Sequence, residues 1–267
     1  MDKTEVKAKI SAQRVEAFGM SDPGKDRDTN EDAIGVFPDR QIFAVADGMG
    51  GYRGGDKASA AAINALSEFF TNKILTDMRA DPALCRTILP ESVLHAHRKV
   101  LETAEKLEVD TLVGSTIAVV FLNDTYLHSC HVGDSRIYTI NLSGITRITD
   151  DHSSVGDLVR LGKMSEMQAR HSPIRNQVSQ ALGSPYNIHP EYRCQPLRAG
   201  DLVLLCTDGL WGMVHDNRLL EISRSQETLE DLCRKLIAAA NDAGGEDNIS
   251  VVLLRICRLA AEKNAGQ

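Results

Sequence analysis

Four segments of the chain are short, almost continuous runs of apolar residues, and they limit the possible folds more than any other feature. They cover residues 42–46, 116–122, 202–206 and 249–256. Valine, isoleucine and leucine dominate these runs, as is typical of β-strands. Because polar residues do not alternate with the apolar ones, we expect each strand to be covered on both faces.

Three other segments carry apolar residues at helical spacing, over residues 58–70, 89–107 and 229–240. The last of these is followed by Gly244 and Gly245, which permit the left-handed backbone that often ends a helix. His97 lies within the second stripe and is predicted to be a packed core histidine. The strands cluster together and two helices are adjacent in sequence. This order favours an α+β fold over repeating βαβ units.

We expect one domain across residues 1–267, with a core over about 14–255 and short polar termini. Residues 152–189 mix glycine and proline with many polar residues, which predicts a surface flap. We call this segment the flap.

Composition excludes several classes of function. The net charge is −7 without a basic cluster, which argues against nucleic-acid binding. No apolar stretch is long enough to span a membrane, and the N-terminus lacks the apolar run of a secretory signal. The six cysteines are scattered without a C-x-x-C pair, which predicts reduced thiols rather than a zinc ribbon or a disulfide framework. We expect a cytoplasmic monomer.

Four aspartates stand next to predicted buried strands or apolar segments: Asp47, Asp134, Asp208 and Asp247. Asp47 and Asp208 each precede glycine, and Asp-Gly taken singly is a common turn dipeptide. Four carboxylates near a core, however, repel one another and lose hydration unless a cation gathers them. A cluster of oxygen ligands without histidine suits Mg²⁺ or Mn²⁺ better than zinc.

The sequence RDTNED, residues 27–32, adds a guanidinium and two further carboxylates to this set, those of Arg27, Glu31 and Asp32. Arginine can bind two phosphate oxygens through parallel hydrogen bonds. The alternative for Arg27 is a surface ion pair with a neighbouring acid. Local sequence leaves both possibilities open.

Seven motifs now stand in order along the chain: RDTNED, DGMGG (47–51), GST (114–116), VGDSR (132–136), TDDHS (149–153), CTDGLW (206–211) and EDNISVV (246–252). In order and spacing they resemble the type 2C family of metal-dependent protein serine/threonine phosphatases, over residues 14–255. The resemblance implies a four-layer αββα sandwich, in which two central antiparallel sheets are flanked by helix pairs, with a two-metal centre at one end.

The resemblance also implies roles for individual residues. Asp47 would bridge two cations, either Mn²⁺ or Mg²⁺, and the Gly48 carbonyl would bind one of them. Asp208 and Asp247 would hold the other. Asp134 resembles the carboxylate that shares a third, weaker metal with Asp208 in bacterial relatives.

Three more residues take roles by the same resemblance. Glu31 and Asp32 would orient metal-bound water, and Arg27 would bind the substrate phosphate. Some members of the family carry a histidine after the Asp-Gly pair as the proposed proton donor. This chain has Met49 there, and a thioether cannot donate a proton. The form DGMGG is similar to that of bacterial members.

The function implied is hydrolysis of phosphoserine and phosphothreonine in proteins by a metal-activated water. The substrates would be phosphorylated proteins of a signalling system that includes a partner serine/threonine kinase. A first alternative is a catalytically silent regulator that binds phosphoproteins, although no proposed ligand is missing. A second is a cysteine-dependent phosphatase, because Cys130 and Arg136 match C-x₅-R. Asp134 inside that loop would repel phosphate, and Cys130 is better explained as a small buried residue of a strand.

Overall fold

The computed structural model describes residues 4–9, 15–50, 54–107, 112–123 and 125–257. Residue 14 and Gly51, which the motif comparison included, lie outside these ranges.

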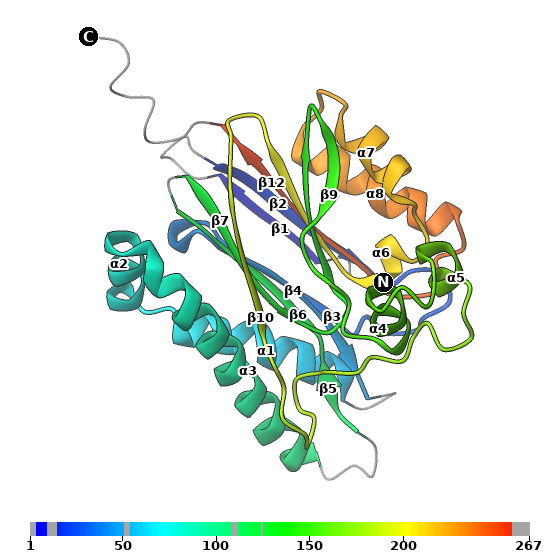
Figure 1. Ribbon diagram of the computed structural model, residues 1–267, viewed down its shortest axis with the longest axis horizontal. Coiled ribbons are helices and arrows are strands. Elements are labelled where there is room, and N and C mark those ends of the chain that lie inside the picture. The colour runs from blue at the N-terminus through cyan, green and yellow to red at the C-terminus, as the bar shows by residue number, and fades with distance from the viewer. Residues whose placement is uncertain (1–3, 10–14, 51–53, 108–111, 124, 258–267) are drawn as a thin grey trace.

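Two antiparallel sheets form the centre of the described structure (Figure 1). The first sheet has the order β1 (Thr4–Lys9), β2 (Val15–Asp22), β12 (Ile249–Ile256), β11 (Leu202–Cys206), β8 (Arg136–Asn141) and β9 (Gly144–Arg147). The second has the order β10 (Glu191–Pro196), β7 (Tyr126–Val132), β6 (Ile117–Leu122), β4 (Ile42–Met49) and β3 (Asp32–Phe37), with β5 (Gly114–Ser115) paired to β4.

The strands contribute to two apolar layers each, which explains their continuous apolar sequences. In β4, Phe43 and Val45 face the layer between the sheets, whereas Ala44 faces the helices. In β11, Val203 lies between the sheets and Leu204 lies under the helices on the other side. Successive side chains of a strand point to opposite faces, so a strand covered twice has no polar face. The prediction of doubly covered strands is confirmed.

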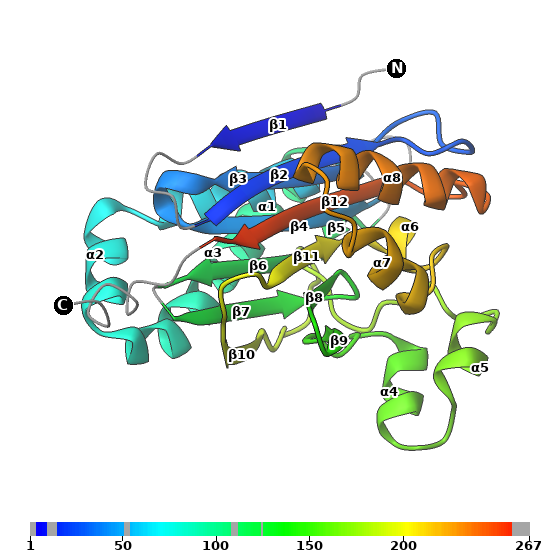
Figure 2. The same ribbon diagram turned by 90° about the horizontal axis from the view of Figure 1, so that it is seen from above.

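Helices cover the outer face of each sheet (Figures 1 and 2). The second sheet is covered by α1 (Gly55–Phe69) and α3 (Cys85–Leu107), with α2 (Asn72–Ala80) beyond them. The first sheet is covered by α8 (Leu229–Asp242) and α7 (Asp216–Ser223), with the single turn α6 (Asp208–Trp211) at one end. The expected α+β architecture of two antiparallel sheets and flanking helices is therefore confirmed.

The predicted elements differ from the observed ones mainly at their ends. The strand expected at 42–46 continues to Met49, because Asp47 pairs with Asp32 in β3 and Gly48 pairs with Ser115 in β5. The helix expected at 58–70 begins at Gly55, and the helix expected at 89–107 begins at Cys85. Those first turns lack the apolar spacing on which the prediction depended.

The flap contains two short helices, α4 (Ser154–Arg160) and α5 (Glu166–Arg170), which stand out from the sheets in Figure 2. Its last part differs from the surface position that we expected. Leu182 is fully buried and pairs with Ser115, with N–H···O distances of 2.8 and 3.1 Å. His97 is half-buried rather than packed in the core, and its Nδ1 accepts a hydrogen bond of 3.1 Å from the N–H of Gly183. No helix among the described residues has the length and apolar character needed to cross a membrane.

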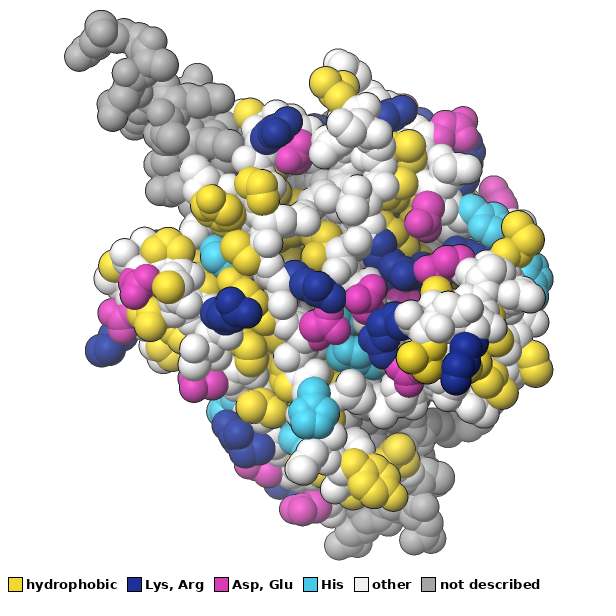
Figure 3. Space-filling view, in the orientation of Figure 1, with side chains coloured by type: hydrophobic (Ala, Val, Ile, Leu, Met, Phe, Trp, Pro, Cys, Tyr) yellow, Lys and Arg dark blue, Asp and Glu magenta, His cyan; other side chains and the backbone are white. Residues whose placement is uncertain are grey.

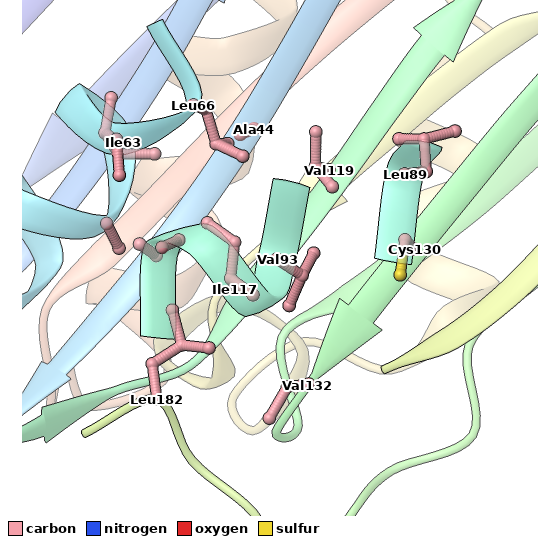
Figure 4. Packing of buried hydrophobic residues seen from close by; sticks show 14 of the residues in the cluster. Ala44, Ile63, Leu66, Leu89, Val93, Ile117, Val119, Cys130, Val132 and Leu182 are labelled. Carbon is pink, nitrogen blue, oxygen red and sulfur yellow. The ribbon is translucent and has the colours of Figure 1, made fainter. Parts of the chain in front are cut away.

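The core under α3 gives a test of the packing. Leu89 is fully buried beside Val93 and Cys130 (Figure 4). Leu89→Ala should lower the free energy of unfolding by about 2–5 kcal/mol, because it removes buried methyl groups and leaves a cavity. Urea denaturation followed by circular dichroism measures this loss. The control is Leu142→Ala, at a side chain that is 99% exposed, which should change the free energy by no more than about 0.5 kcal/mol. Equal losses in the two variants would contradict the packing.

Candidate metal centre

Strand pairing brings the predicted carboxylates together at one end of the sandwich. Asp47 lies near the end of β4 and is directly opposite Asp32, at the start of β3, in the antiparallel register. Asp208 follows β11, and Asp247 precedes its antiparallel neighbour β12. The end of one strand therefore lies beside the beginning of the next in both sheets.

Hydrogen bonds between the two sheets connect the chain segments at this end of the molecule. The Thr207 hydroxyl donates to Asp32 Oδ2 at 2.8 Å and accepts from the Ser250 N–H at 3.0 Å. Asn248 binds the loop that carries Arg27: its Oδ1 accepts from the Glu31 N–H at 2.8 Å, and its Nδ2 donates to the carbonyls of Pro23 and Thr29, both at 2.9 Å. Sequence reasoning did not assign these supporting roles to Thr207 and Asn248. They depend on the pairing of distant segments.

Glycine after Asp47 and Asp208 serves close packing rather than a turn. Gly48 lies within β4 and Gly209 within α6, and neither has a positive φ. A Cβ on Gly48 would lie 2.0 Å from the Gly55 carbonyl oxygen, and one on Gly209 would lie 2.0 Å from the Asn248 carbonyl oxygen. Only glycine fits such close backbone contacts. The explanation of these Asp-Gly pairs as β-turn dipeptides is therefore wrong, because one pair lies within a strand and the other begins a turn of helix.

Burial and mutual repulsion raise the pKa values of the carboxyl groups. For Asp47 the pKa lies well above its ordinary value, first because of burial and then because of the charges of Asp208 and Asp32. Burial, followed by the charge of Asp247, raises the pKa of Asp208 to about 6. The pKa of Asp32 is also raised well above its ordinary value, chiefly by burial, although hydrogen bonds from Ser250 and Thr207 oppose the shift. These groups resist being charged together.

Asp134 joins the cluster from the turn between β7 and β8. It is buried, and its pKa lies well above the ordinary value because of burial and then the charge of Asp208. The Trp211 Nε1–H donates to its carbonyl oxygen at 3.0 Å. The sequence-predicted carboxylates at the ends of β4, β11 and β12 and in the β7–β8 turn thus interact in one place.

The donor atoms of this cluster fit hard divalent cations. Asp32 Oδ1 and Asp208 Oδ1 are buried and accept no hydrogen bond from any residue that the structure describes. A buried acceptor without a partner is costly, so such atoms point to a bound ligand. Carboxylate and carbonyl oxygens are the ligands that Mg²⁺ and Mn²⁺ prefer. The residues present therefore fit the metals that the sequence implied.

Arg27 and Glu31 lie at the edge of the cluster. Arg27 Nη2 is 2.8 Å from Asp247 Oδ2, and its side chain is 51% exposed. This is the ion pair that we considered as the alternative, but its partner is a candidate metal ligand. Burial raises the pKa of Glu31, although the charge of Arg27 opposes this. A Cβ on Gly55 would lie 2.6 Å from the Glu31 carboxyl carbon, which places this carboxylate against the start of α1.

A cleft of about 950 Å³ opens beside the carboxylates, and Arg27, Asp208 and Asp247 form part of its wall. The rest of the wall comes mainly from the flap helices and from α6 and α7. Basic and acidic side chains meet on this face of the molecule (Figure 3). A cleft of this volume falls in the range typical of ligand-binding sites.

A histidine cluster that sequence reasoning missed supports the Asp134 turn. The ligand atoms of His131, His152 and Glu191 lie within 4.8 Å of one another, and the two rings stack at 4.5 Å. The Gly133 N–H donates to His152 Nδ1 at 3.3 Å, so the proton of neutral His152 lies on Nε2, 3.5 Å from Glu191 Oε2. His131 Nε2 donates to the Asp150 carbonyl at 2.7 Å. Through these hydrogen bonds the cluster supports the backbone of Gly133, the neighbour of Asp134.

The C-x₅-R pattern does not form a nucleophilic site. Cys130 is fully buried against α3 (Figure 4), and burial raises the pKa of its thiol far above the ordinary value. Arg136 binds the Asp151 carboxylate through Nε and Nη2, at 2.9 and 2.6 Å. A nucleophilic cysteine instead needs an environment that lowers the pKa of its thiol, such as a nearby positive charge that is free to stabilise the thiolate. The interpretation of Cys130 as a small buried residue is confirmed.

Comparison with known proteins gives a consistent result. The sequence profile of the family described as "Protein phosphatase 2C" matches residues 25–253. The serine/threonine phosphatase stp of Listeria monocytogenes is 35% identical over 240 residues, which cover 88% of this chain and 93% of the relative. The crystal structure of the serine/threonine phosphatase PstP/Ppp of Mycobacterium tuberculosis superimposes with a TM-score of 0.81 at 30% identity, covering 92% of this chain and 100% of that one.

A second solved structure, of the catalytic domain of PstP in complex with two manganese ions, gives a TM-score of 0.76 at 27% identity and covers 91% of this chain and 99% of that one. The match extends over most of the chain, as the seven motifs indicated. This chain therefore belongs to the protein phosphatase 2C family, a family of serine/threonine phosphatases.

Proposed function

We propose that this chain hydrolyses phosphoserine and phosphothreonine in proteins at a centre of two Mn²⁺ or Mg²⁺ ions. Asp47, the Gly48 carbonyl, Asp208 and Asp247 would hold the ions, and Asp134 with Asp208 would hold a third. The observation that carries the proposal is the cluster of half-buried aspartates with raised pKa values, two of which have a buried carboxylate oxygen that accepts no hydrogen bond from the described residues. When bound, the ions neutralise the carboxylates and lower the pKa of water that attacks phosphorus.

The chain's own groups would position the substrate and the water. The Arg27 guanidinium faces the cleft beside Asp208 and can bind two phosphate oxygens, while Asp247 holds it in place. Asp32 accepts a hydrogen bond from Thr207 through Oδ2, which leaves Oδ1 to orient water. Glu31 would act in the same way from the edge of the cluster. Positioning of this kind is the main task of a protein in phosphoryl transfer.

The proton for the leaving serine or threonine oxygen cannot come from Met49, because a thioether has no acidic proton. We propose that water ordered beside Asp134 and Asp208 supplies it.

The substrates would be phosphorylated proteins of a partner serine/threonine kinase, and we propose that the chain acts as a cytoplasmic monomer. A catalytically silent phosphoprotein-binding regulator would instead bind phosphopeptide without turning it over. The presence of every proposed ligand side chain at one end of the sandwich favours the enzyme.

The first test measures both the activity and the thermal stability of one variant. Asp47→Asn should lower kcat on a phosphothreonine peptide by at least about 10²-fold, because it removes a proposed metal ligand. In chelator at pH 7.5, the same variant should unfold at a higher temperature than the wild type, since it removes a charge from a cluster of like charges. Turnover assays and differential scanning calorimetry give the two values.

The matched control is Asp39→Asn, an exposed aspartate outside the cluster, which should leave both values unchanged. Wild-type activity in excess chelator would contradict the proposed centre, and so would an Asp47→Asn variant that is folded, active and less stable without metal.

The second test concerns the phosphate. Arg27→Ala should raise KM for phosphopeptide and weaken inhibition by free phosphate, by about 1.5–3 kcal/mol in binding free energy. Steady-state kinetics measure both changes. Arg218→Ala is the control, because Arg218 is exposed on α7 and pairs with Glu221. If KM and phosphate inhibition stay unchanged in Arg27→Ala, Arg27 serves only as an ion-pair partner of Asp247.

The third test separates metal chemistry from cysteine chemistry. Cys130→Ser should keep most of the phosphatase activity, since the buried thiol cannot readily ionise. Thiol-alkylating reagents should not inactivate the folded wild type in proportion to labelling. A folded but inactive Cys130→Ser variant, together with phosphate trapped on the wild-type cysteine in chelator, would overturn the metal-centred proposal.

A further inference from the structure

Trp211 is the single tryptophan of the chain, and it connects three separate segments. It ends α6, the turn that begins with Asp208. Its ring lies under the guanidinium of Arg136, with Cζ 3.5 Å from the ring centroid. Its Nε1–H donates to the Asp134 carbonyl at 3.0 Å, and its own carbonyl accepts from Arg170 of the flap helix α5.

The guanidinium over the ring is itself fixed. Arg136 is 4% exposed. It binds Asp151 with two hydrogen bonds, of 2.9 and 2.6 Å, and donates to the Tyr138 hydroxyl at 3.1 Å. A cation fixed in this way holds the indole ring in one position, because the attraction between a cation and a ring face is stronger away from water.

Arg170 makes a different kind of contact from the other arginines of the flap. Arg160 pairs with Asp157 and Arg175 pairs with Glu246. Arg170 makes no ion pair with the residues that the structure describes. Instead its Nη1 donates to the carbonyls of Trp211 and Gly212, the latter at 3.0 Å. A cation at the C-terminal end of a helical turn satisfies carbonyl groups that have no partner within that turn.

One turn of helix separates this contact from the carboxylate cluster. The Gly212 N–H donates to the Asp208 carbonyl at 2.7 Å, which links the two ends of α6 directly. A shift of Trp211 would displace Asp208 through α6 and Asp134 through the indole N–H. These are the two carboxylates that would share the third ion.

We propose that Trp211 is a positioning residue that links the flap, through Arg170, to the spacing of Asp134 and Asp208. The proposal rests on the proposed function of these two aspartates as metal ligands. Because coupling between two sites is reciprocal, metal binding at Asp134 and Asp208 changes the surroundings of Trp211, and release of the flap contact weakens that metal site.

Fluorescence of the single tryptophan tests the link without an activity assay. Chelator-treated protein is titrated with Mg²⁺, which does not itself quench indole emission. In the wild type the emission should change as the weaker site fills. Arg170→Ala should move that transition to at least about 10-fold higher Mg²⁺, and Arg170→Lys, which keeps a cation near the carbonyls, should recover part of the shift. Arg218→Ala should titrate as the wild type does.

Kinetics with p-nitrophenyl phosphate give a second readout. Arg170→Ala should need correspondingly more Mg²⁺ for half-maximal kcat. Trp211→Phe, which keeps a ring but loses the N–H to Asp134, should shift the Mg²⁺ requirement in the same direction. Circular dichroism checks that the variants are folded.

The outcomes separate the two proposals. If the wild type binds Mg²⁺ and needs it for turnover, while folded Arg170→Ala and Trp211→Phe match the wild type in their Mg²⁺ dependence, the link is wrong and the proposed function stands. If the wild type neither binds Mg²⁺ nor needs a metal, the proposed function fails and the link fails with it.

Discussion

The repulsion among crowded, half-buried or buried aspartates at one end of the sandwich is the constraint on which the rest of the structure depends. Antiparallel pairing places Asp32 opposite Asp47, and the burial of Asp208 raises its pKa to about 6. Without a counter-charge, such an arrangement lowers the stability of the fold. The sandwich therefore needs a large apolar core to keep these groups in place, and both faces of its central strands supply one.

The supporting residues around the aspartates keep the backbone segments close and correctly oriented. Gly48 and Gly209 allow backbone contacts that no side chain would permit, and Asn248 ties the Arg27 loop to the start of β12. Trp211 extends this support to the flap. The protein contributes geometry and the proposed metals contribute charge, which is the division of roles expected for phosphoryl transfer.

The sequence predicted four central strands, β4, β6, β11 and β12, because double burial removes the polar residues from them. It did not predict β2 or β8, which are also interior strands of the first sheet. It also did not predict β3, whose residues are mostly half-buried and include Gly35, or β10, whose residues are half-buried or exposed. The candidate ligands could be named because aspartates stand out beside apolar runs and because their motifs resemble a known family. The contact of Trp211 with Asp134 could not be foreseen, since it joins residues 77 positions apart through the packing of α6 against the β7–β8 turn. The histidine pair under Gly133 was missed for the same reason.

The number of protons released when Mg²⁺ binds tests the central claim most directly. It is obtained by isothermal titration calorimetry in buffers of different ionisation enthalpy. The folded pKa of Asp208, about 6, lies above the ordinary value for an aspartate, so metal-free protein holds extra protons near pH 6 that cations must displace. The account predicts proton release that is larger at pH 6 than at pH 8, and Mg²⁺ affinity that falls as the pH drops below about 6. Binding of Mg²⁺ without proton release at either pH, or no binding at all, would contradict it.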